Sequence, residues 1–129
     1  MKKYLVIFLT ALFLLNHVKA QPRMDDVVNV LNGSSIESIV KYFDNVVDIT
    51  LNNNQSTYSK SQAEMVIRNF FSKNAVTSFK IKYKGNSADD QAFYLIGDMK
   101  TNGHGIYRVY LFFKIKGKDH YLQEMKIEQ

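Results

Sequence analysis

The chain has 129 residues, of which 46% are hydrophobic, a formal charge of +5 at neutral pH and no cysteine. This length suits a single domain, and the lack of cysteine excludes disulfides, thiolate catalysis and a lipid attached through a cysteine. The positive charge would favour a nucleic-acid partner only if it lay on the folded domain.

The first 20 residues have the pattern of an export signal. Lys2 and Lys3 precede an uncharged run of 12 residues at 4–15, and the small residue Ala20 precedes Gln21. Because a helix needs roughly 20 apolar residues to span a bilayer, this run is too short for a membrane anchor. The pattern predicts cleavage after Ala20; the alternative is a buried N-terminal helix.

Cleavage would remove most of the positive charge. Without Lys2, Lys3 and Lys19 the 17 basic residues become 14 against the same 12 acids, so the formal charge falls from +5 to +2. A weak charge with scattered lysines predicts no nucleic-acid partner. We expect residues 21–129 to form one exported domain, periplasmic or extracellular, with no membrane attachment once the signal is removed.

Two helices are predicted first. Apolar residues recur at helical spacing in "MDDVVNVLNGSS", acids occupy its first turn, and Gly33 is a typical C-terminal stop. Ser34 and Glu37 then have the spacing of a capping box. It would open a second helix with an apolar stripe that extends to Phe43; the stripe consists of Ile36, Ile39, Val40 and Phe43.

A strand and a long third helix follow. The β-branched stretch "VVDITL" predicts a strand over residues 46–51, and "NNNQ" predicts a turn after it. Helical periodicity returns in "YSKSQAEMVIRNFFSKN", with Ser61 and Glu64 spaced as a capping box. The apolar side of this helix is formed by Ala63, Val66, Ile67, Phe70 and Phe71.

The rest of the chain alternates between apolar and polar residues, which predicts four antiparallel strands. They pass through Phe79, Tyr94, Tyr107 and Met125, and "NG" at 102–103 and "KGKD" at 116–119 supply hairpin turns. Three helices and a short strand ahead of a meander give an α+β fold, in which N-terminal helices pack on a curved antiparallel sheet.

Several of these segments resemble a known family. The order "LNGSSIESIVKYF", "VDITL", "YSKSQAEMVIRNFF", "SFKIKYKG", "YLIG", "GIYRVYLFFK" and "MKIE" is similar to domain-of-unknown-function family 4783, a small exported bacterial family. The resemblance covers residues 24–128 and implies the cone-shaped roll of the nuclear transport factor 2-like (cystatin-like) superfamily. Members of that superfamily include isomerases, dehydratases and hydrolases, so the fold implies no particular reaction. The family implies no catalytic residues.

Catalytic motifs are sparse in this sequence. The parts from which an acid-plus-tyrosine pocket would be built are Asp48, Asp98, Tyr94, Tyr110 and Arg108. A carboxylate in an apolar cavity can transfer protons and a tyrosine hydroxyl can stabilise an oxyanion. The alternative places Asp48 and Asp98 at strand ends or on the wet face of the sheet.

The sequence predicts neither a metal site nor a nucleic-acid site. His104 lies in a turn and His120 opens the last strand, without a ligand spacing around either, so both are expected in solvent and neither a metal nor a cofactor is predicted. In "SFKIKYKG" the lysines alternate with Phe79, Ile81 and Tyr83. Rings and amines should therefore point to opposite faces of the strand, which does not suit a nucleic-acid site.

One strand has an unusual second face. In "GIYRVYLFFKIKG" the odd positions from Tyr107 to Ile115 are apolar and predict contact with the helices, whereas the even positions are Ile106, Arg108, Tyr110 and Phe112. Tyrosine and arginine are enriched at protein interfaces, so this face is a candidate homodimer or partner surface. The alternative is that the protein's own N-terminal helices or loops cover it.

Two functions are consistent with the sequence. The first is an exported binding or protein-interaction module without catalytic activity, whose partner is a second copy, a small apolar ligand or another exported protein. The second is a small hydrolase, isomerase or dehydratase. A cavity lined by Asp48 or Asp98 with a tyrosine hydroxyl favours the enzyme, and an interior filled by Phe70, Phe71 and Phe113 favours the module.

Overall fold

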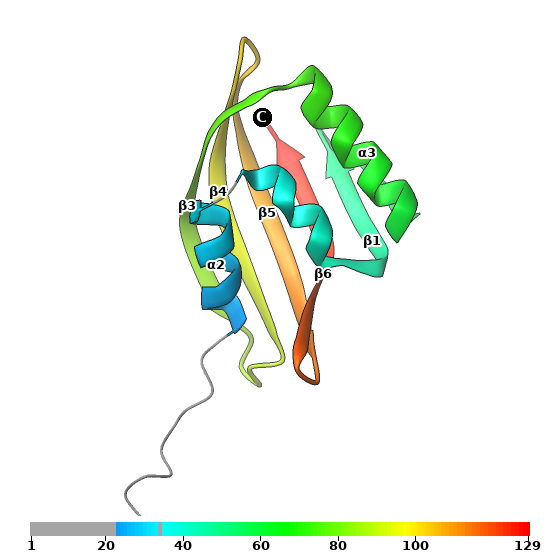
Figure 1. Cartoon of the computed structure of the whole chain (residues 1–129), viewed down its shortest axis with the longest axis vertical. Coiled ribbons are helices and arrows are strands. Elements are labelled where there is room, and N and C mark those ends of the chain that lie inside the picture. The colour runs from blue at the N-terminus through cyan, green and yellow to red at the C-terminus, as the bar shows by residue number, and fades with distance from the viewer. Residues whose placement is uncertain (1–22, 34) are drawn as a thin grey trace, which may run out of the picture.

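The computed structural model describes residues 23–33 and 35–129. The predicted signal peptide and the predicted cap at Ser34 lie outside these residues. Helices α2 (Arg23–Gly33), η1 (Ile36–Tyr42) and α3 (Lys60–Lys73) lie on one side of a six-stranded sheet (Figure 1). No helix in the described part of the chain is both long and apolar enough to cross a membrane. The predicted α+β architecture is confirmed.

The starts of the second and third helices differ from the predicted ones. η1 is a 3-10 helix preceded by Ser35, whose side chain makes no capping bond. The capping box of α3 is formed by Ser59 and Gln62, so the prediction of Ser61 and Glu64 is wrong. With Ser61 as the cap, the helix would begin at residue 62; α3 instead begins at Lys60, directly after residues 54–59, which are paired in the sheet.

The sheet has the strand order β2-β1-β6-β5-β4-β3. Its strands are β1 (Phe43–Leu51), β2 (Asn54–Ser59), β3 (Val76–Asn86), β4 (Ala92–Thr101), β5 (Gly105–Lys116) and β6 (Asp119–Glu128). The four predicted meander strands are confirmed as β3 to β6, all antiparallel to their sequence neighbours. β1 runs parallel to β6.

The first hairpin of the sheet differs from the prediction. β1 begins at Phe43, which therefore belongs to the sheet and not to the second helix, and its side chain is fully buried. The expected turn is only Asn52 and Asn53, which both have positive φ, as a two-residue type I′ hairpin requires. The remaining polar residues form β2, an edge strand without a fully buried side chain.

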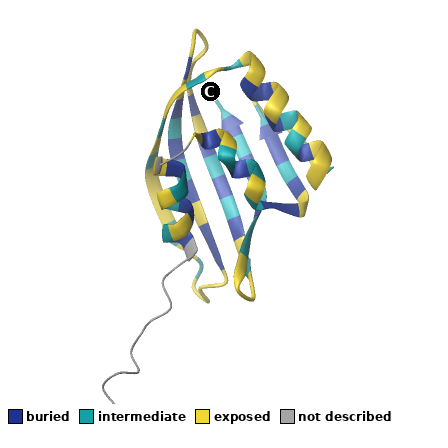
Figure 2. Cartoon of the chain, viewed as in Figure 1, coloured by how far each residue is buried: buried dark blue, intermediate teal, exposed yellow. Residues whose placement is uncertain are grey.

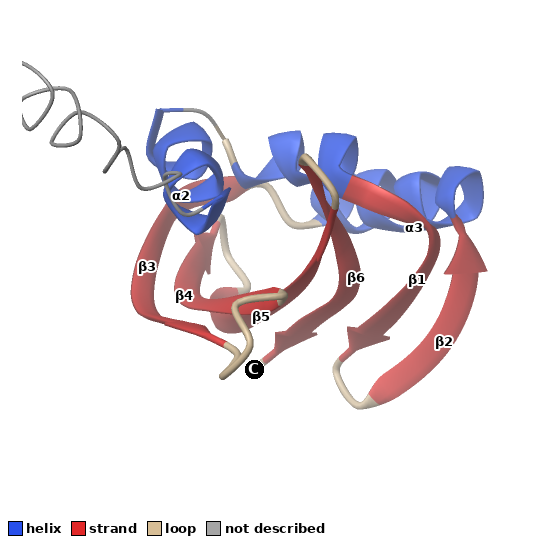
Figure 3. Cartoon of the chain, turned by 90° about the horizontal axis from the view of Figure 1, so that it is seen from below, coloured by secondary structure: helices blue, strands red, loops and turns tan. Residues whose placement is uncertain are grey.

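The sheet is strongly bent around the helices (Figure 3). A β-bulge places Lys82 between Ile81, which pairs with Gly97, and Tyr83, which pairs with Ile96. A Cβ on Gly97 would lie 2.7 Å from the carbonyl oxygen of Lys80, so only glycine allows this close approach of β3 and β4. Bulges and strand glycines are the features that curve antiparallel sheets.

The hydrophobic core lies between the helices and the concave face of the sheet (Figure 2). Phe93 and Phe113 stack there with ring centroids 4.7 Å apart, and each is at most 1% exposed. His120 was expected in solvent, but its ring is half-buried next to Tyr42, Phe93 and Phe113, so that prediction is wrong. His120 pairs with Ile115, whose side chain packs against the core. His104 lies exposed in its turn as expected.

Candidate functional site

The register of β4 and β5 brings most of the sequence-predicted site residues onto one surface. Opposite each other lie Asp98 and Arg108, Ile96 and Tyr110, Tyr94 and Phe112, and Lys100 and Ile106. Their neighbours Tyr107, Val109 and Leu111 are buried in the core, as alternation requires. The four candidate interface residues therefore share the convex face of the sheet with the catalytic candidates Asp98 and Tyr94, and the described helices do not cover this face (Figure 3).

The apolar part of this face extends onto β3. Tyr83 was expected on the same side as Phe79 and Ile81, but the bulge at Lys82 turns it to the convex face, where it is 59% exposed beside Ile96. Ring and amine can thus occur on one face of β3, contrary to the alternation argument. We call the resulting surface the convex patch: Tyr83, Tyr94, Ile96, Ile106, Tyr110 and Phe112.

The rings of the convex patch are arranged in register. Tyr94 and Tyr110 stack with centroids 6.3 Å apart, and the Tyr94 ring extends over Gly85 of β3, where a Cβ would come within 2.6 Å of it. On the other side of Tyr110, the ammonium of Lys126 lies 5.6 Å from the ring centroid. Tyr94 remains 37% exposed and Ile106 56% exposed, so a large apolar surface faces solvent.

Charges of both signs border the convex patch. Arg108 Nε lies 3.8 Å from Asp98 Oδ1, and Lys126 Nζ lies 3.7 Å from Glu124 Oε1. Both pairs are long, with exposed cations and half-buried carboxylates, so they contribute little to stability and leave their hydrogen-bonding capacity available. Partial burial is the largest cause of the raised pKa of Tyr110, and the nearby Glu124 and Tyr94 raise this pKa further. Its hydroxyl therefore stays protonated at neutral pH and can donate a hydrogen bond.

The catalytic candidates are not assembled into one pocket: Asp48 lines a hollow of about 380 Å³ that contains Asp44 but neither Asp98 nor a tyrosine. Asp48 lies on β1, away from Asp98 and Tyr94, and accepts a 2.6 Å hydrogen bond from Thr57 Oγ1. Asp98 and Tyr94 lie on the open convex face, where no apolar cavity encloses a carboxylate. Among the described residues, no three His, Asp or Glu side chains gather where a metal ion could bind.

A buried acid was missed by the sequence analysis. Asp44 is 9% exposed and accepts hydrogen bonds from Lys116 Nζ at 2.7 Å, the Asn45 amide at 2.8 Å and Gln123 Nε2 at 3.1 Å. The sequence prediction did not include Asp44, because it ended the second helix at Phe43 and began the strand at residue 46, which left Asp44 in the connection between them.

Glu124 and Lys126 also lie on the convex face, opposite Phe112 and Tyr110, and were not among the predicted residues. Their alternation with Met125 and Ile127 was the signal that could have added these two charges to the predicted face.

Comparison with solved structures supports the fold. A nuclear transport factor 2-like protein from Cytophaga hutchinsonii aligns with a TM-score of 0.54 and 8% identity, covering 81% of this chain and 90% of that one. This likeness shows the fold alone, and it confirms the predicted cone-shaped α+β roll. A search of curated proteins found no match.

Two bacterial structures and a family model identify the family of this chain. A protein of the DUF4783 family from Bacteroides ovatus aligns with a TM-score of 0.67 and 24% identity, covering 72% of this chain and 82% of that one. Another from Bacteroides uniformis aligns with a TM-score of 0.66 and 27% identity, covering 72% and 83%. A family model described as "Domain of unknown function (DUF4783)" matches residues 24–128. The predicted resemblance is thus confirmed, and the chain belongs to the DUF4783 family.

Proposed function

We propose that this protein is an exported, non-catalytic interaction module that forms a homodimer through the convex face of its sheet. The observation that carries the proposal is the convex patch, whose six large side chains lie on three adjacent strands without cover from a described helix. Contiguous exposed apolar surface rimmed by polar groups is typical of protein interfaces.

The charges around the convex patch favour a second copy as the partner. A two-fold interface brings the same surface together twice, so it must be self-complementary. Asp98 and Arg108 stand next to each other, and the side chain of Arg108 is 64% exposed. Each copy can therefore offer a carboxylate to the partner's guanidinium and a guanidinium to the partner's carboxylate around a shared aromatic centre.

The interior supports a module better than an enzyme. Phe70, Phe71 and Phe113 all belong to the buried core, and Phe70 packs edge-on against Tyr107 with centroids 5.6 Å apart. The interior beneath the helices is thus filled by aromatic side chains. Asp48 and Asp98 lie outside that space.

The proposal is tested by measuring mass in solution. Tyr110→Glu introduces a charge at the centre of the convex patch, where it would be desolvated against the partner's rings. We expect native mass spectrometry at micromolar concentration to report a dimer for the wild type and mainly a monomer for this variant. The same spectrum of protein recovered from the exported fraction tests for export and for a retained ligand.

A matched substitution separates interface loss from a general effect of the new charge. Met65 of α3 is 70% exposed on the helical side of the molecule, so Met65→Glu should leave the dimer intact. The circular dichroism spectra of both variants should match that of the wild type. A monomeric wild type, or an unchanged dimer in Tyr110→Glu, would rule out this interface.

A further inference from the structure

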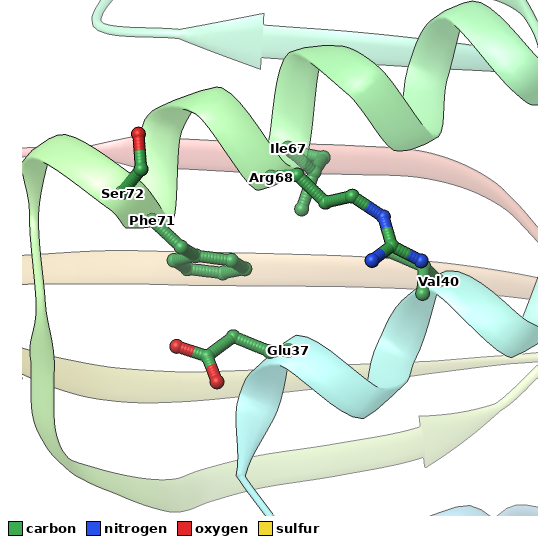
Figure 4. A pocket seen from close by; sticks show the side chains of 6 residues that line it. All are labelled: Glu37, Val40, Ile67, Arg68, Phe71 and Ser72. Atoms are coloured by element: carbon green, nitrogen blue, oxygen red, sulfur yellow. The ribbon is translucent and has the colours of Figure 1, made fainter.

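A groove runs between η1 and α3 (Figure 4), on the helical side of the sheet and therefore opposite the convex patch (Figure 3). Its volume is about 330 Å³, which lies at the lower end of the range for small-ligand sites, roughly 300–1,000 Å³. The residues that line it are Glu37, Val40, Ile67, Arg68, Phe71 and Ser72.

The spacing of these residues gives the groove an apolar floor and polar rims. On α3, Ile67 and Phe71 are one turn apart and buried, while the next row, Arg68 and Ser72, is exposed. On η1, Glu37 and Val40 are three residues apart, a spacing that aligns side chains in a 3-10 helix. Two helices facing each other in this way enclose an apolar channel with one charge on each wall.

The two charges of the groove are available to a ligand. Arg68 and Glu37 are both exposed, and among the described residues neither takes part in an ion pair. Glu37 Oε2 accepts one hydrogen bond, at 3.0 Å from Ser35 Oγ. Figure 4 shows the guanidinium of Arg68 reaching toward Val40, and the carboxylate of Glu37 on the η1 side of the Phe71 ring. Apolar surface therefore separates a positive from a negative group.

We infer that this groove binds a short apolar peptide with free termini. Its carboxylate would pair with the guanidinium of Arg68, which suits bidentate recognition, and its ammonium would pair with Glu37. Apolar side chains would cover Phe71 and Val40 between the two charges. The volume of about 330 Å³ has room for a dipeptide, on the order of ten to twenty non-hydrogen atoms. The inference does not depend on the proposed dimer.

The first experiment titrates the purified, nitrogen-15-labelled protein with the dipeptide Leu-Leu and follows amide chemical shifts. We expect saturable shifts confined to η1 and α3, with a Kd of roughly 0.1–1 mM, as befits a small ligand in a shallow groove. N-acetyl-Leu-Leu, which lacks the ammonium, and Leu-Leu-amide, which lacks the carboxylate, should each bind about tenfold more weakly, because each loses one charged contact.

Two substitutions assign the ends of the peptide. Arg68→Gln should weaken Leu-Leu about tenfold and leave the Kd of Leu-Leu-amide unchanged, because that ligand has no carboxylate to lose. Glu37→Gln should weaken Leu-Leu by a similar factor and leave N-acetyl-Leu-Leu unchanged. A purely structural effect of either substitution would weaken all three ligands equally.

Matched controls come from the same helix. Lys60→Gln and Glu64→Gln remove one positive and one negative charge of α3 outside the groove lining, so both should bind Leu-Leu as the wild type does. The inference is overturned by a titration that does not saturate up to 10 mM, about ten times the weakest expected Kd. Shifts that map to the convex face, or equal affinity for the free and blocked peptides, overturn it as well.

Discussion

At the scale of single residues, Asp44 joins parts of the chain that are far apart in sequence. Its carboxylate, at the start of β1, binds Lys116 at the end of β5 and Gln123 of β6. Burial alone would raise the pKa of Asp44, but the hydrogen bonds from Lys116, Asn45 and Gln123 together outweigh it and hold the pKa below its ordinary value. Folding therefore favours the ionised carboxylate of Asp44 over its protonated form, compared with the unfolded chain.

We predict that Asp44→Asn lowers the free energy of unfolding by about 1–2 kcal/mol at pH 7, a modest value because half of the Lys116 side chain is exposed. A lowered folded-state pKa stabilises at pH values above the unfolded-state pKa and ceases to do so as pH falls through the folded-state pKa. In urea titrations the difference between wild type and variant should thus persist down to about pH 5 and shrink below about pH 4.

The exposed Asp119 provides a control for the loss of an acid close to the same hairpin. Asp119→Asn should change the free energy of unfolding by less than about 0.5 kcal/mol. A difference between wild type and Asp44→Asn that stayed constant from pH 7 to pH 3 would contradict the assignment of the effect to the charge of Asp44.

At the scale of elements, the contact of β3 with β4 determines which side chains reach the convex face. The extra residue Lys82 and the close approach at Gly97 occur at the same level of the sheet. Phe79 packs on Gly97 from the concave side, where a Cβ would lie 2.7 Å from its ring. The bend therefore orients Tyr83 outward while Phe79 stays against the core.

Two glycines of this strand pair should differ in their tolerance of alanine. Gly97→Ala should lower the free energy of unfolding by about 1–3 kcal/mol in urea titrations, because the backbone carbonyl of Lys80 cannot move aside. Gly85→Ala meets only the partly exposed Tyr94 ring, which can rotate away, so its cost should be below about 0.5 kcal/mol. Equal costs at the two positions would refute this explanation of the bend.

The elements with a one-sided hydrophobic pattern were predictable from the sequence. α3 and β4 to β6 each bury one face, and β3 half-buries one, so their periodicity indicates their type. β2 was missed because its residues 54–59 are polar and include no fully buried side chain, and its pairing depends on the asparagine turn. The outward turn of Tyr83 depends on backbone pairing with β4, which leaves no trace in the alternation of β3.

The candidate site was predicted in part for the same reason. The even positions of β5 share one face by strand geometry alone, so Ile106, Arg108, Tyr110 and Phe112 could be grouped from the sequence. The opposing residues of β4 required the register. The groove between η1 and α3 could not be predicted, because it depends on how two helices sit beside each other on the sheet.

At the scale of the whole molecule, the two proposed binding surfaces lie on opposite sides of the sheet. The convex patch belongs to β3, β4 and β5, whereas the groove belongs to η1 and α3 on the concave side. They share no residue, and the close-packed core lies between them. A dimer formed through the sheet would leave both grooves open to solvent.

We therefore predict that the two surfaces act independently. Tyr110→Glu should change the mass in solution but alter the Kd for Leu-Leu by less than about twofold, since substitutions without shared partners usually add. Arg68→Gln should weaken the peptide and leave the dimer unchanged. Amide-shift titrations and native mass spectrometry on the same two samples measure both quantities; a loss of peptide affinity in Tyr110→Glu would reveal coupling through the core.

The parallel pairing of β1 with β6 has a consequence for the order in which the fold can form. Strand β1 (residues 43–51) pairs in parallel with residues 122–127 of β6, about 75 residues later in the chain. The β1–β2 hairpin and the β3–β5 strands can therefore join into one sheet only after β6 has been synthesised. The β1–β2 hairpin with α3 and the β3–β5 meander can form early, but no nascent chain that lacks β6 can unite them. Such long-range closure predicts that folding is slow and is completed late.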